Sequence, residues 1–252
     1  VIVEYRAGAS GQIGADYVSK ANPDGYTLMM ATTAVINDKN VSKFVGISLV
    51  SADAYVLVVH PSLPVKNAAD LIAYAKANPK KLTFGSSGIG AASHLSGELF
   101  KARAGIDMLH VPYKGSAPAI NDTIGGQTQI MFPSLFTGVP FVKTNRLQAL
   151  AIAGTKRSPL LPDVPTLKEV GIAGVEVEQW YAIFAPAKTP KETVAKLNQA
   201  LNKVLEDKEI IKRIEGHGAD VETSTPEQLG EMVRKDLVKW RQVVQRAKLQ
   251  AD

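Results

Sequence analysis

Small hydroxyl-bearing residues and glycines gather where strands of this chain are expected to end. In open α/β sheets a ligand binds at the carboxyl ends of the strands, where helix N-termini present unpaired backbone N–H groups. Hydroxyls add hydrogen bonds there without adding charge, and small residues let a ligand approach the backbone. The pattern predicts a crevice that binds an anion by hydrogen bonds. The residues concerned are Thr32, Thr33, Ser86, Ser87, Gly88 and Ser134.

Covalent and cofactor chemistry find little support in the sequence. The chain has no cysteine, which excludes thiolate catalysis, thiolate-bound metals and disulfides. A nucleophile elbow needs a glycine two residues on each side of its serine, and neither Ser86 nor Ser87 has both. Residues 88–93 depart from the dinucleotide fingerprint because the last position is serine, and no Gly-Lys-Ser/Thr phosphate loop occurs. We therefore expect no cofactor and no metal.

The histidines offer one rival interpretation. They are too far apart in sequence for a metal-binding pair on one helix. His60 and His110 are interpreted as structural, and His94 is expected to pack against or hydrogen-bond the preceding loop, with a ligand contact as the alternative. A serine hydrolase using Ser86 or Ser87 with His94 remains a rival, although no acid stands at a suggestive spacing.

Composition indicates an ordinary globular protein. The chain has 252 residues, of which 45% are hydrophobic and 21% are charged. This balance is sufficient for a buried core and argues against disorder. No apolar run approaches the roughly 18 residues of a membrane span. The net charge is +5, but the basic residues are scattered, so no nucleic acid is expected as a partner.

The hydrophobic pattern predicts strands alternating with helices, which is typical of parallel βαβ units and an α/β fold. Asn67 is expected to cap a helix that ends before Asn78-Pro79, and residues 175–184 form a long extended stretch. Two sequences, Thr189-Pro190-Lys191-Glu192 and Thr225-Pro226-Glu227-Gln228, resemble capping boxes and predict helices after them. The strands are expected at 1–5, 26–30, 55–59, 82–84, 108–111, 129–132 and 147–152, and further helices at 13–21, 92–104 and 116–124.

Several motifs together resemble one known family, the substrate-binding proteins of tripartite tricarboxylate transporters, also called the Bug or TctC-like family. Their order and spacing, more than any single motif, carry the resemblance, which covers essentially the whole chain. The motifs are residues 6–14 (RAGASGQIG), 22–28 (NPDGYTL), 84–88 (FGSSG) with His94-Leu95, 110–119 (HVPYKGSAPA), 161–166 (LPDVPT), and Trp180 with Ala185-Pro186.

The resemblance implies a periplasmic solute-binding protein with a two-lobed periplasmic-binding-protein fold of type II and a cleft between the lobes. The lobes are expected at 1–57 plus 176–252 and at 58–175, with the crossings near 55–59 and 175–181. It implies capture of a carboxylate for a membrane permease, without catalysis, by a monomer. Sensing, with the closed form presented to a membrane signalling partner, is the alternative. A signal peptide is absent and expected to have been removed.

Two departures from the family pattern affect these expectations. Family members normally begin with a further strand and a glycine-rich loop, so an N-terminal element is expected to be missing. The family often carries an acid after Phe132, where this chain has Pro133 and Ser134. Without that acid, no carboxylate is evident to pair with a ligand ammonium, which favours a dicarboxylate or aromatic acid over an amino acid.

Three more residues join the predicted ligand contacts. Tyr113 and Lys114 lie in the motif that follows the strand at 108–111, and Lys114 has a surface ion pair as its alternative role. Trp180 is interpreted mainly as core packing, with a ligand platform as the minority interpretation.

Overall fold

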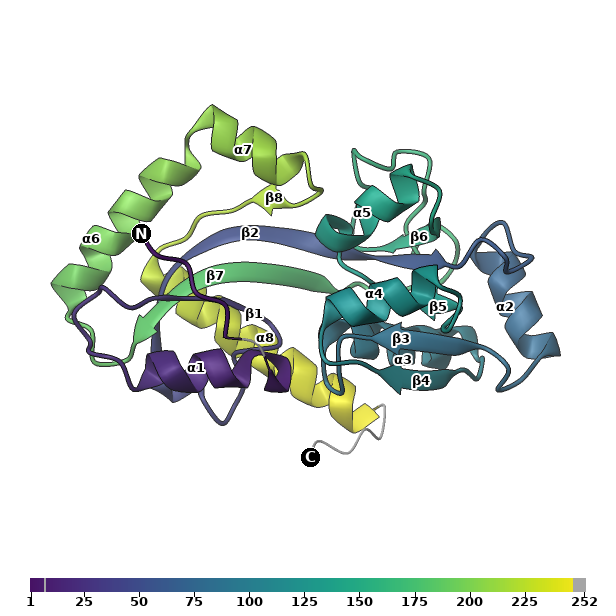
Figure 1. Ribbon diagram of the computed structural model, residues 1–252, viewed down its shortest axis with the longest axis horizontal. Coiled ribbons are helices and arrows are strands. Elements are labelled where there is room, and N and C mark those ends of the chain that lie inside the picture. Colours follow the sequence, from purple (N-terminus) through teal and green to yellow (C-terminus); the bar gives the residue numbers. More distant parts are fainter. Residues whose placement is uncertain (7, 247–252) are drawn as a thin grey trace. The chain divides into compact units, whose positions relative to one another are not determined.

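The computed structural model, which describes residues 1–6 and 8–246, divides into two compact units (Figure 1). Two strands, β2 (Phe44–Val59) and β7 (Glu178–Pro186), contain unit boundaries, so the chain passes between the units within extended segments. Unit 1 comprises Val1–Ala52, Trp180–Glu215 and Asp220–Gln242, and unit 2 consists mainly of Asp53–Gln179 with Gly216–Ala219.

Unit 1 is built on an antiparallel sheet. Strand β1 (Met29–Thr32) pairs with β7, placing Thr32 opposite Tyr181, and Ser51 and Ala52 of β2 pair with β8 (Asp220–Val221). Helix α8 (Pro226–Arg246) packs Leu229 and Val233 into the core of this unit. The other helices of the unit are α1 (Gln12–Ser19), α6 (Lys191–Leu205), α7 (Lys208–Glu215) and the short 3-10 turns η1 (Ala9–Gly11) and η2 (Val41–Lys43).

Unit 2 contains the parallel part of the fold. Strand β3 (Thr83–Ser86) runs parallel to both β4 (Leu109–Pro112) and β5 (Ile130–Met131), whereas β2 pairs antiparallel with β5 and β6 (Gln148–Ala153). The helices are α2 (Ala68–Ala77), α3 (Ala92–Ala104), α4 (Ser116–Ile124) and α5 (Leu135–Lys143). Among the described residues, the prediction of parallel βαβ units is thus confirmed for β3, β4 and β5.

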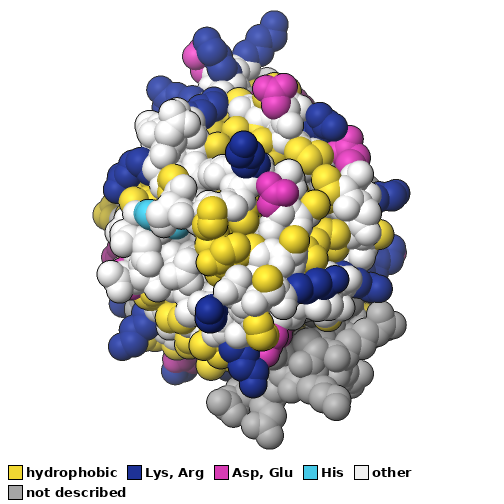
Figure 2. Space-filling view, turned by 90° about the vertical axis from the view of Figure 1, so that its right-hand side faces the viewer, with side chains coloured by type: hydrophobic (Ala, Val, Ile, Leu, Met, Phe, Trp, Pro, Cys, Tyr) yellow, Lys and Arg dark blue, Asp and Glu magenta, His cyan; other side chains and the backbone are white. Residues whose placement is uncertain are grey.

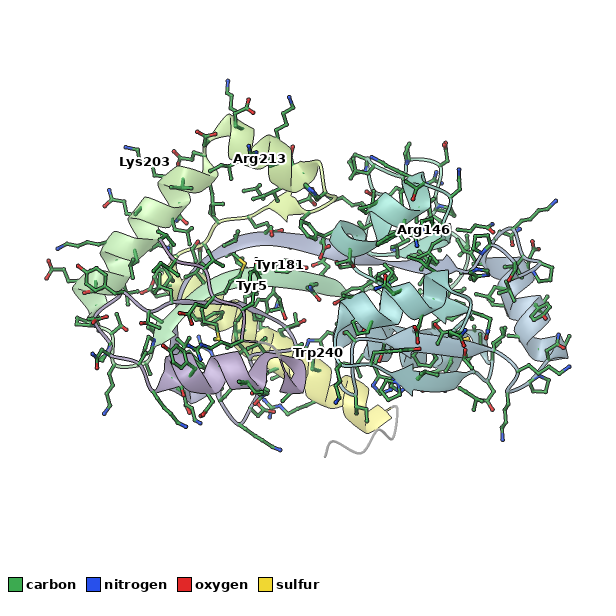
Figure 3. All side chains as sticks on the ribbon, in the orientation of Figure 1. Tyr5, Arg146, Tyr181, Lys203, Arg213 and Trp240 are labelled. Atoms are coloured by element: carbon green, nitrogen blue, oxygen red, sulfur yellow. The ribbon has the colours of Figure 1, made fainter. Side chains whose placement is uncertain are left out.

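The predicted strand at residues 1–5 is wrong. The segment pairs with no strand in the described chain, and Val1, Ile2 and Tyr5 are largely exposed (Figure 3 labels Tyr5). A β-branched composition favours a strand only where a neighbouring strand is present to accept its hydrogen bonds. Strand β1 begins later than predicted, at Met29, because the Asp24 carboxylate accepts the Tyr26 N–H and extends the preceding turn.

Other elements were not predicted or were misjudged in length. The sequence does not predict helix α5, because Gly138 and Pro140 lie within it and these residue types normally mark loops. Helix α7 and strand β8 were not predicted either. Strand β2 is 16 residues long, whereas only residues 55–59 were expected to be extended.

The two predicted capping boxes have opposite outcomes. At the start of α8, the Thr225 hydroxyl accepts the Gln228 N–H at 3.2 Å and the Gln228 amide oxygen accepts the Thr225 N–H at 2.8 Å, so this box is confirmed. The box at Thr189 is wrong, because its hydroxyl donates to the Pro186 carbonyl at 2.8 Å and does not cap the helix. Helix α6 nevertheless forms, with Val194 buried in a small apolar cluster.

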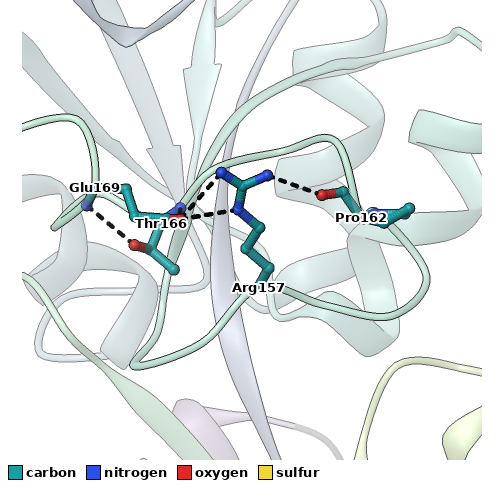
Figure 4. A network of polar contacts seen from close by, with 4 residues as sticks. All are labelled: Arg157, Pro162, Thr166 and Glu169. Atoms are coloured by element: carbon teal, nitrogen blue, oxygen red, sulfur yellow. Dashed lines mark hydrogen bonds and ion pairs between the residues drawn. The ribbon is translucent and has the colours of Figure 1, made fainter.

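The motif at residues 161–166 is held in place by a polar network (Figure 4). The Arg157 guanidinium donates to both oxygens of Glu169, each at 3.1 Å from Nε, and to the Pro162 carbonyl at 3.1 Å. Glu169 also accepts the Thr166 N–H at 2.6 Å. The Arg157 hydrogen bond lowers the pKa of Glu169 to about 2. Glu169 therefore stays charged at acidic pH, and its ion pair with Arg157 persists there.

The surface agrees with the modest net charge. Figure 2 shows one face on which Lys and Arg side chains are scattered among hydrophobic, acidic and other polar groups. Within the described residues, no helix is both long and apolar enough to cross a membrane.

Asn67 provides a direct test of local helix formation. Its side chain accepts the Asp70 N–H at 2.9 Å and so caps α2, as predicted. Asn67→Ala should lower the free energy of unfolding by about 0.5–2 kcal/mol, the usual effect of losing such a cap. Urea unfolding followed by circular dichroism measures the change. Lys66→Ala, at the exposed neighbouring position, is the matched control, and equal losses in the two variants would refute the capping role.

Candidate functional site

The loop after β3 is organised around the buried hydroxyl of Ser86. This hydroxyl accepts the Gly88 N–H and donates to the Gly88 carbonyl, both at 3.2 Å. It also lies 2.6 Å from Nε2 of His110 on the neighbouring strand β4. Ser86 has no exposed surface, so its hydroxyl makes all of its hydrogen bonds within the protein and fixes the conformation of the loop.

Ser87 occupies a different environment. It is half-buried, and its backbone N–H donates to the Ser93 hydroxyl at 3.0 Å, while the two hydroxyl oxygens lie 2.9 Å apart. Ser93 is in the first turn of α3, so this pair ties the loop to the start of the helix. Gly88 and Gly90 have φ angles of 138° and 76°, which L side chains rarely adopt, so the loop requires glycine at both positions.

A second loop, after β4, is hydrogen-bonded to the first. The Tyr113 N–H donates to the Ser86 carbonyl at 3.0 Å, and the Gly115 N–H donates to the Ser87 carbonyl at 3.1 Å. These bonds extend the parallel β3–β4 ladder into both loops. The loops therefore lie side by side at the carboxyl ends of two parallel strands, as the sequence predicts.

The helices that follow these loops begin without side-chain caps. Neither Ala91, before α3, nor Gly115, before α4, provides a capping hydrogen bond from a side chain. The first-turn N–H groups of an uncapped helix, together with the helix dipole, favour an anion. This arrangement gives unit 2 two helix N-termini next to the paired loops.

Tyr113 and Lys114 differ in how they are held. The Tyr113 hydroxyl donates to the Asp122 carboxylate at 2.8 Å, and burial together with this contact raises the pKa of Tyr113 to about 12. Tyr113 is therefore neutral and fixed. Lys114 is exposed, and no ion pair involving it is found in the described chain, so the surface salt bridge of its alternative role is not formed there.

Ser134 lies beside a carboxylate that sequence analysis missed. Ser134 is the N-cap residue of α5 and is 4% exposed. The buried Asp53, on β2, accepts the Phe136 N–H at 2.9 Å, and the Ser134 side chain lies close enough to affect its pKa. A carboxylate thus lies near Ser134, although Asp53 is 5% exposed, and the expectation that no carboxylate is evident to pair with a ligand ammonium stays a prediction. Because Asp53 and Ser134 are 81 positions apart, only the packing of α5 against β2 brings them together.

The environment of Asp53 is unusual for an acid. Burial raises its pKa to about 7, against the opposing effects of the Phe136 N–H and the Ser134 side chain. Its second oxygen, Oδ1, is buried and has no hydrogen-bond partner within the described residues. A buried carboxylate with one unsatisfied oxygen favours the protonated form.

The remaining predicted contacts belong to unit 1. Thr32 ends β1 and its hydroxyl accepts the Ala34 N–H at 3.4 Å, while the buried hydroxyl of Thr33 has no partner among the residues described. Trp180 is 6% exposed and lies in the core of unit 1, as its packing interpretation predicts. Its Nε1–H donates to Asp236 at 3.0 Å, and Figure 3 labels Tyr181 beside it on β7.

The geometry does not assemble the rival hydrolase. Ser86 contacts His110, and Nδ1 of His94 instead accepts the Gly90 N–H at 3.1 Å. The loop contact expected of His94 is thus confirmed. Within the described chain, no carboxylate hydrogen-bonds either imidazole, and no cluster of His, Asp and Glu is suited to a metal. A buried serine without an oriented base–acid pair lacks the parts of a catalytic triad.

Comparison with solved structures identifies the class of protein. Rpa4515 from R. palustris, solved with adipate, is 32% identical and superimposes with a TM-score of 0.93 over 98% of this chain and 86% of its own. The periplasmic binding protein BugD is 32% identical, with a TM-score of 0.92 over 100% and 88%. MatC from Rhodopseudomonas palustris, with bound malate, is 29% identical, with a TM-score of 0.86 over 94% and 85%. The fold is the two-lobed type II fold of periplasmic binding proteins.

The family follows from the sequence comparison. The model of the tripartite tricarboxylate transporter family receptor, TctC, matches residues 1–249. The protein BugT from Bordetella pertussis is 32% identical over 97% of this chain and 78% of its own length. The chain belongs to the tripartite tricarboxylate transporter receptor family, as its motifs indicated. Its relatives are binding proteins rather than enzymes, and the family implies an extracytoplasmic location.

Asp53 gives a pH-dependent prediction. Its folded pKa lies above the ordinary value of 3.8, so the acid stabilises the fold when protonated and loses that contribution as pH rises from about 4 to about 7. Asp53→Asn does not titrate. Relative to this variant, the parent should therefore lose about 2–4 kcal/mol of stability across that window, given about 1.36 kcal/mol per pKa unit.

Thermal unfolding of both proteins between pH 4.5 and 8 measures this difference. Asp24→Asn, which removes an exposed carboxylate and keeps a side-chain acceptor for the Tyr26 N–H, is the control for the loss of one negative charge. A constant difference between the parent and Asp53→Asn would show that Asp53 does not titrate in this range.

Proposed function

We propose that this protein captures an organic acid, most simply a dicarboxylate, and delivers it to the membrane permease of a tripartite tricarboxylate transporter. The observation that supports this most is the pair of hydrogen-bonded loops at the ends of β3 and β4, followed by two helices without side-chain caps. Backbone N–H groups and hydroxyls are donors, and donors suit carboxylate oxygens.

Within this proposal the residues have distinct parts. Ser87 donates from its hydroxyl, Gly88 allows close approach, and Ser86 holds the loop from below. Tyr113 and Lys114 belong to the adjoining loop, where Lys114 adds a positive charge. Thr32, Thr33, Ser134 and Trp180 remain predicted contacts, with the buried Trp180 the weakest of them.

The ligand class is supported by the ligands of solved relatives. Adipate and malate, bound in the solved relatives, are both dicarboxylates without an amino group. Because Asp53 supplies a carboxylate beside Ser134, the lack of an acid directly after Phe132 does not by itself disfavour an amino acid. A panel of adipate, malate, an aromatic acid, aspartate and glutamate in calorimetry distinguishes these classes, and no binding by any acid would contradict the proposed function.

Ser87 offers the sharpest test of the site. Ser87→Ala removes a half-buried hydroxyl that would otherwise hydrogen-bond a carboxylate, and should weaken binding of the best acid by about 1–3 kcal/mol, roughly five- to 150-fold. Isothermal calorimetry measures the dissociation constant. Ser62→Ala removes an exposed hydroxyl outside both loops and serves as the control. Equal affinities of the parent and Ser87→Ala would place the ligand elsewhere.

Ligand binding should also make the protein more compact. Periplasmic binding proteins close two lobes around their ligand by a hinge motion. Small-angle scattering with and without a saturating acid should show a smaller radius of gyration in the bound form. An unchanged radius at confirmed saturation would argue that binding does not involve closure.

A further inference from the structure

A stack of aromatic rings lies directly beneath the loop at residues 86–90. The ring centroids of His94 and His110 are 3.9 Å apart with an interplanar angle of 14°, and those of His110 and Phe84 are 4.8 Å apart. His94 is 3% exposed and Phe84 is fully buried. The stack therefore joins helix α3, which carries His94, to strand β4, which carries His110.

Each histidine holds a different part of the loop. His110 Nε2 contacts the Ser86 hydroxyl, which in turn binds both the N–H and the carbonyl of Gly88. His94 Nδ1 accepts the Gly90 N–H. Because glycine has little conformational preference of its own, these contacts fix a backbone that would otherwise be free.

The hydrogen bond to Gly90 also fixes a protonation state. Nδ1 of His94 can accept an N–H only when it carries no proton, so a protonated His94 would direct one N–H at another. A charge on either ring would also lie against its stacked neighbour. The charged groups near the pair are Glu98 and Lys101, both on α3 and joined to each other at 3.0 Å, with Lys101 also 5.8 Å from the Phe84 ring.

We infer that His94 and His110 are positioning residues that, as a neutral stacked pair, hold the loop at residues 86–90 in the conformation that binds the carboxylate. This inference rests on the proposed function and adds to it the residues that preorganise the site. Neither histidine needs to touch the ligand. Burial lowers the pKa of both, that of His110 to about 4, which agrees with a neutral pair at neutral pH.

The binding test uses variants that keep the stack but remove the hydrogen bonds. His110→Phe and His94→Phe should each weaken binding of the best acid, at pH 7.5, by at least about tenfold, with far-ultraviolet circular dichroism unchanged. His60→Gln, which alters a histidine outside the stack, is the control and should bind as the parent does. Parent-like affinity in both Phe variants would overturn the inference and leave the proposed function standing.

A second measurement needs no ligand, so it tests the pair even if no acid binds. Amide hydrogen exchange of Gly88 and Gly90, expressed as protection relative to an unstructured chain, should be lower in the parent at pH 4 than at pH 7, because protonation of the pair removes the acceptor of the Gly90 N–H. In His94→Asn, the side-chain oxygen can accept the Gly90 N–H at every pH, so protection of Gly90 should persist at pH 4. In His110→Phe, protection of Gly88 should already be low at pH 7. Protection that is independent of pH in the parent and unchanged in His110→Phe would refute the positioning role.

Discussion

The parallel pairing of β3 with β4 is the constraint on which the candidate site depends. Its register places Phe84 opposite His110 and Ser86 opposite Pro112. The same ladder continues past the strand ends, where Tyr113 and Gly115 donate to the carbonyls of the first loop. A shift of one residue would turn His110 to the other face of the sheet and remove the partner of Ser86.

Close packing of α3 on β3 sets the position of the helix relative to this ladder. A Cβ at Gly97 would lie 2.3 Å from Cε2 of Phe84, a distance that atoms cannot reach, so only glycine permits this approach. The approach brings Ser93 and His94, one turn earlier in α3, into contact with the loop. The geometry of the loop therefore depends on a residue that never touches it.

Much of this arrangement could be predicted from the sequence, and the reasons for the failures are physical. Helix α3 was predicted with its observed ends, because the polar loop that precedes it is a local signal. The adjacency of the loops followed from strand order in α/β folds. Asp53 and the Ser86–His110 contact were missed because both depend on register and packing between distant segments. The strand predicted at residues 1–5 is wrong for the same reason, since the sequence pattern says nothing about whether a neighbouring strand is available.

One carboxylate in unit 1 has a spectroscopic consequence. The chain contains two tryptophans, and the Nε1–H groups of Trp180 and Trp240 both donate to the same oxygen of Asp236, each at 3.0 Å. Figure 3 labels Trp240 on α8. Indole emission is sensitive to charge near the ring, so the tryptophan emission of this protein depends on one shared carboxylate between β7 and α8. Both indoles belong to unit 1, so tryptophan emission reports on that unit, whereas the paired loops belong to unit 2.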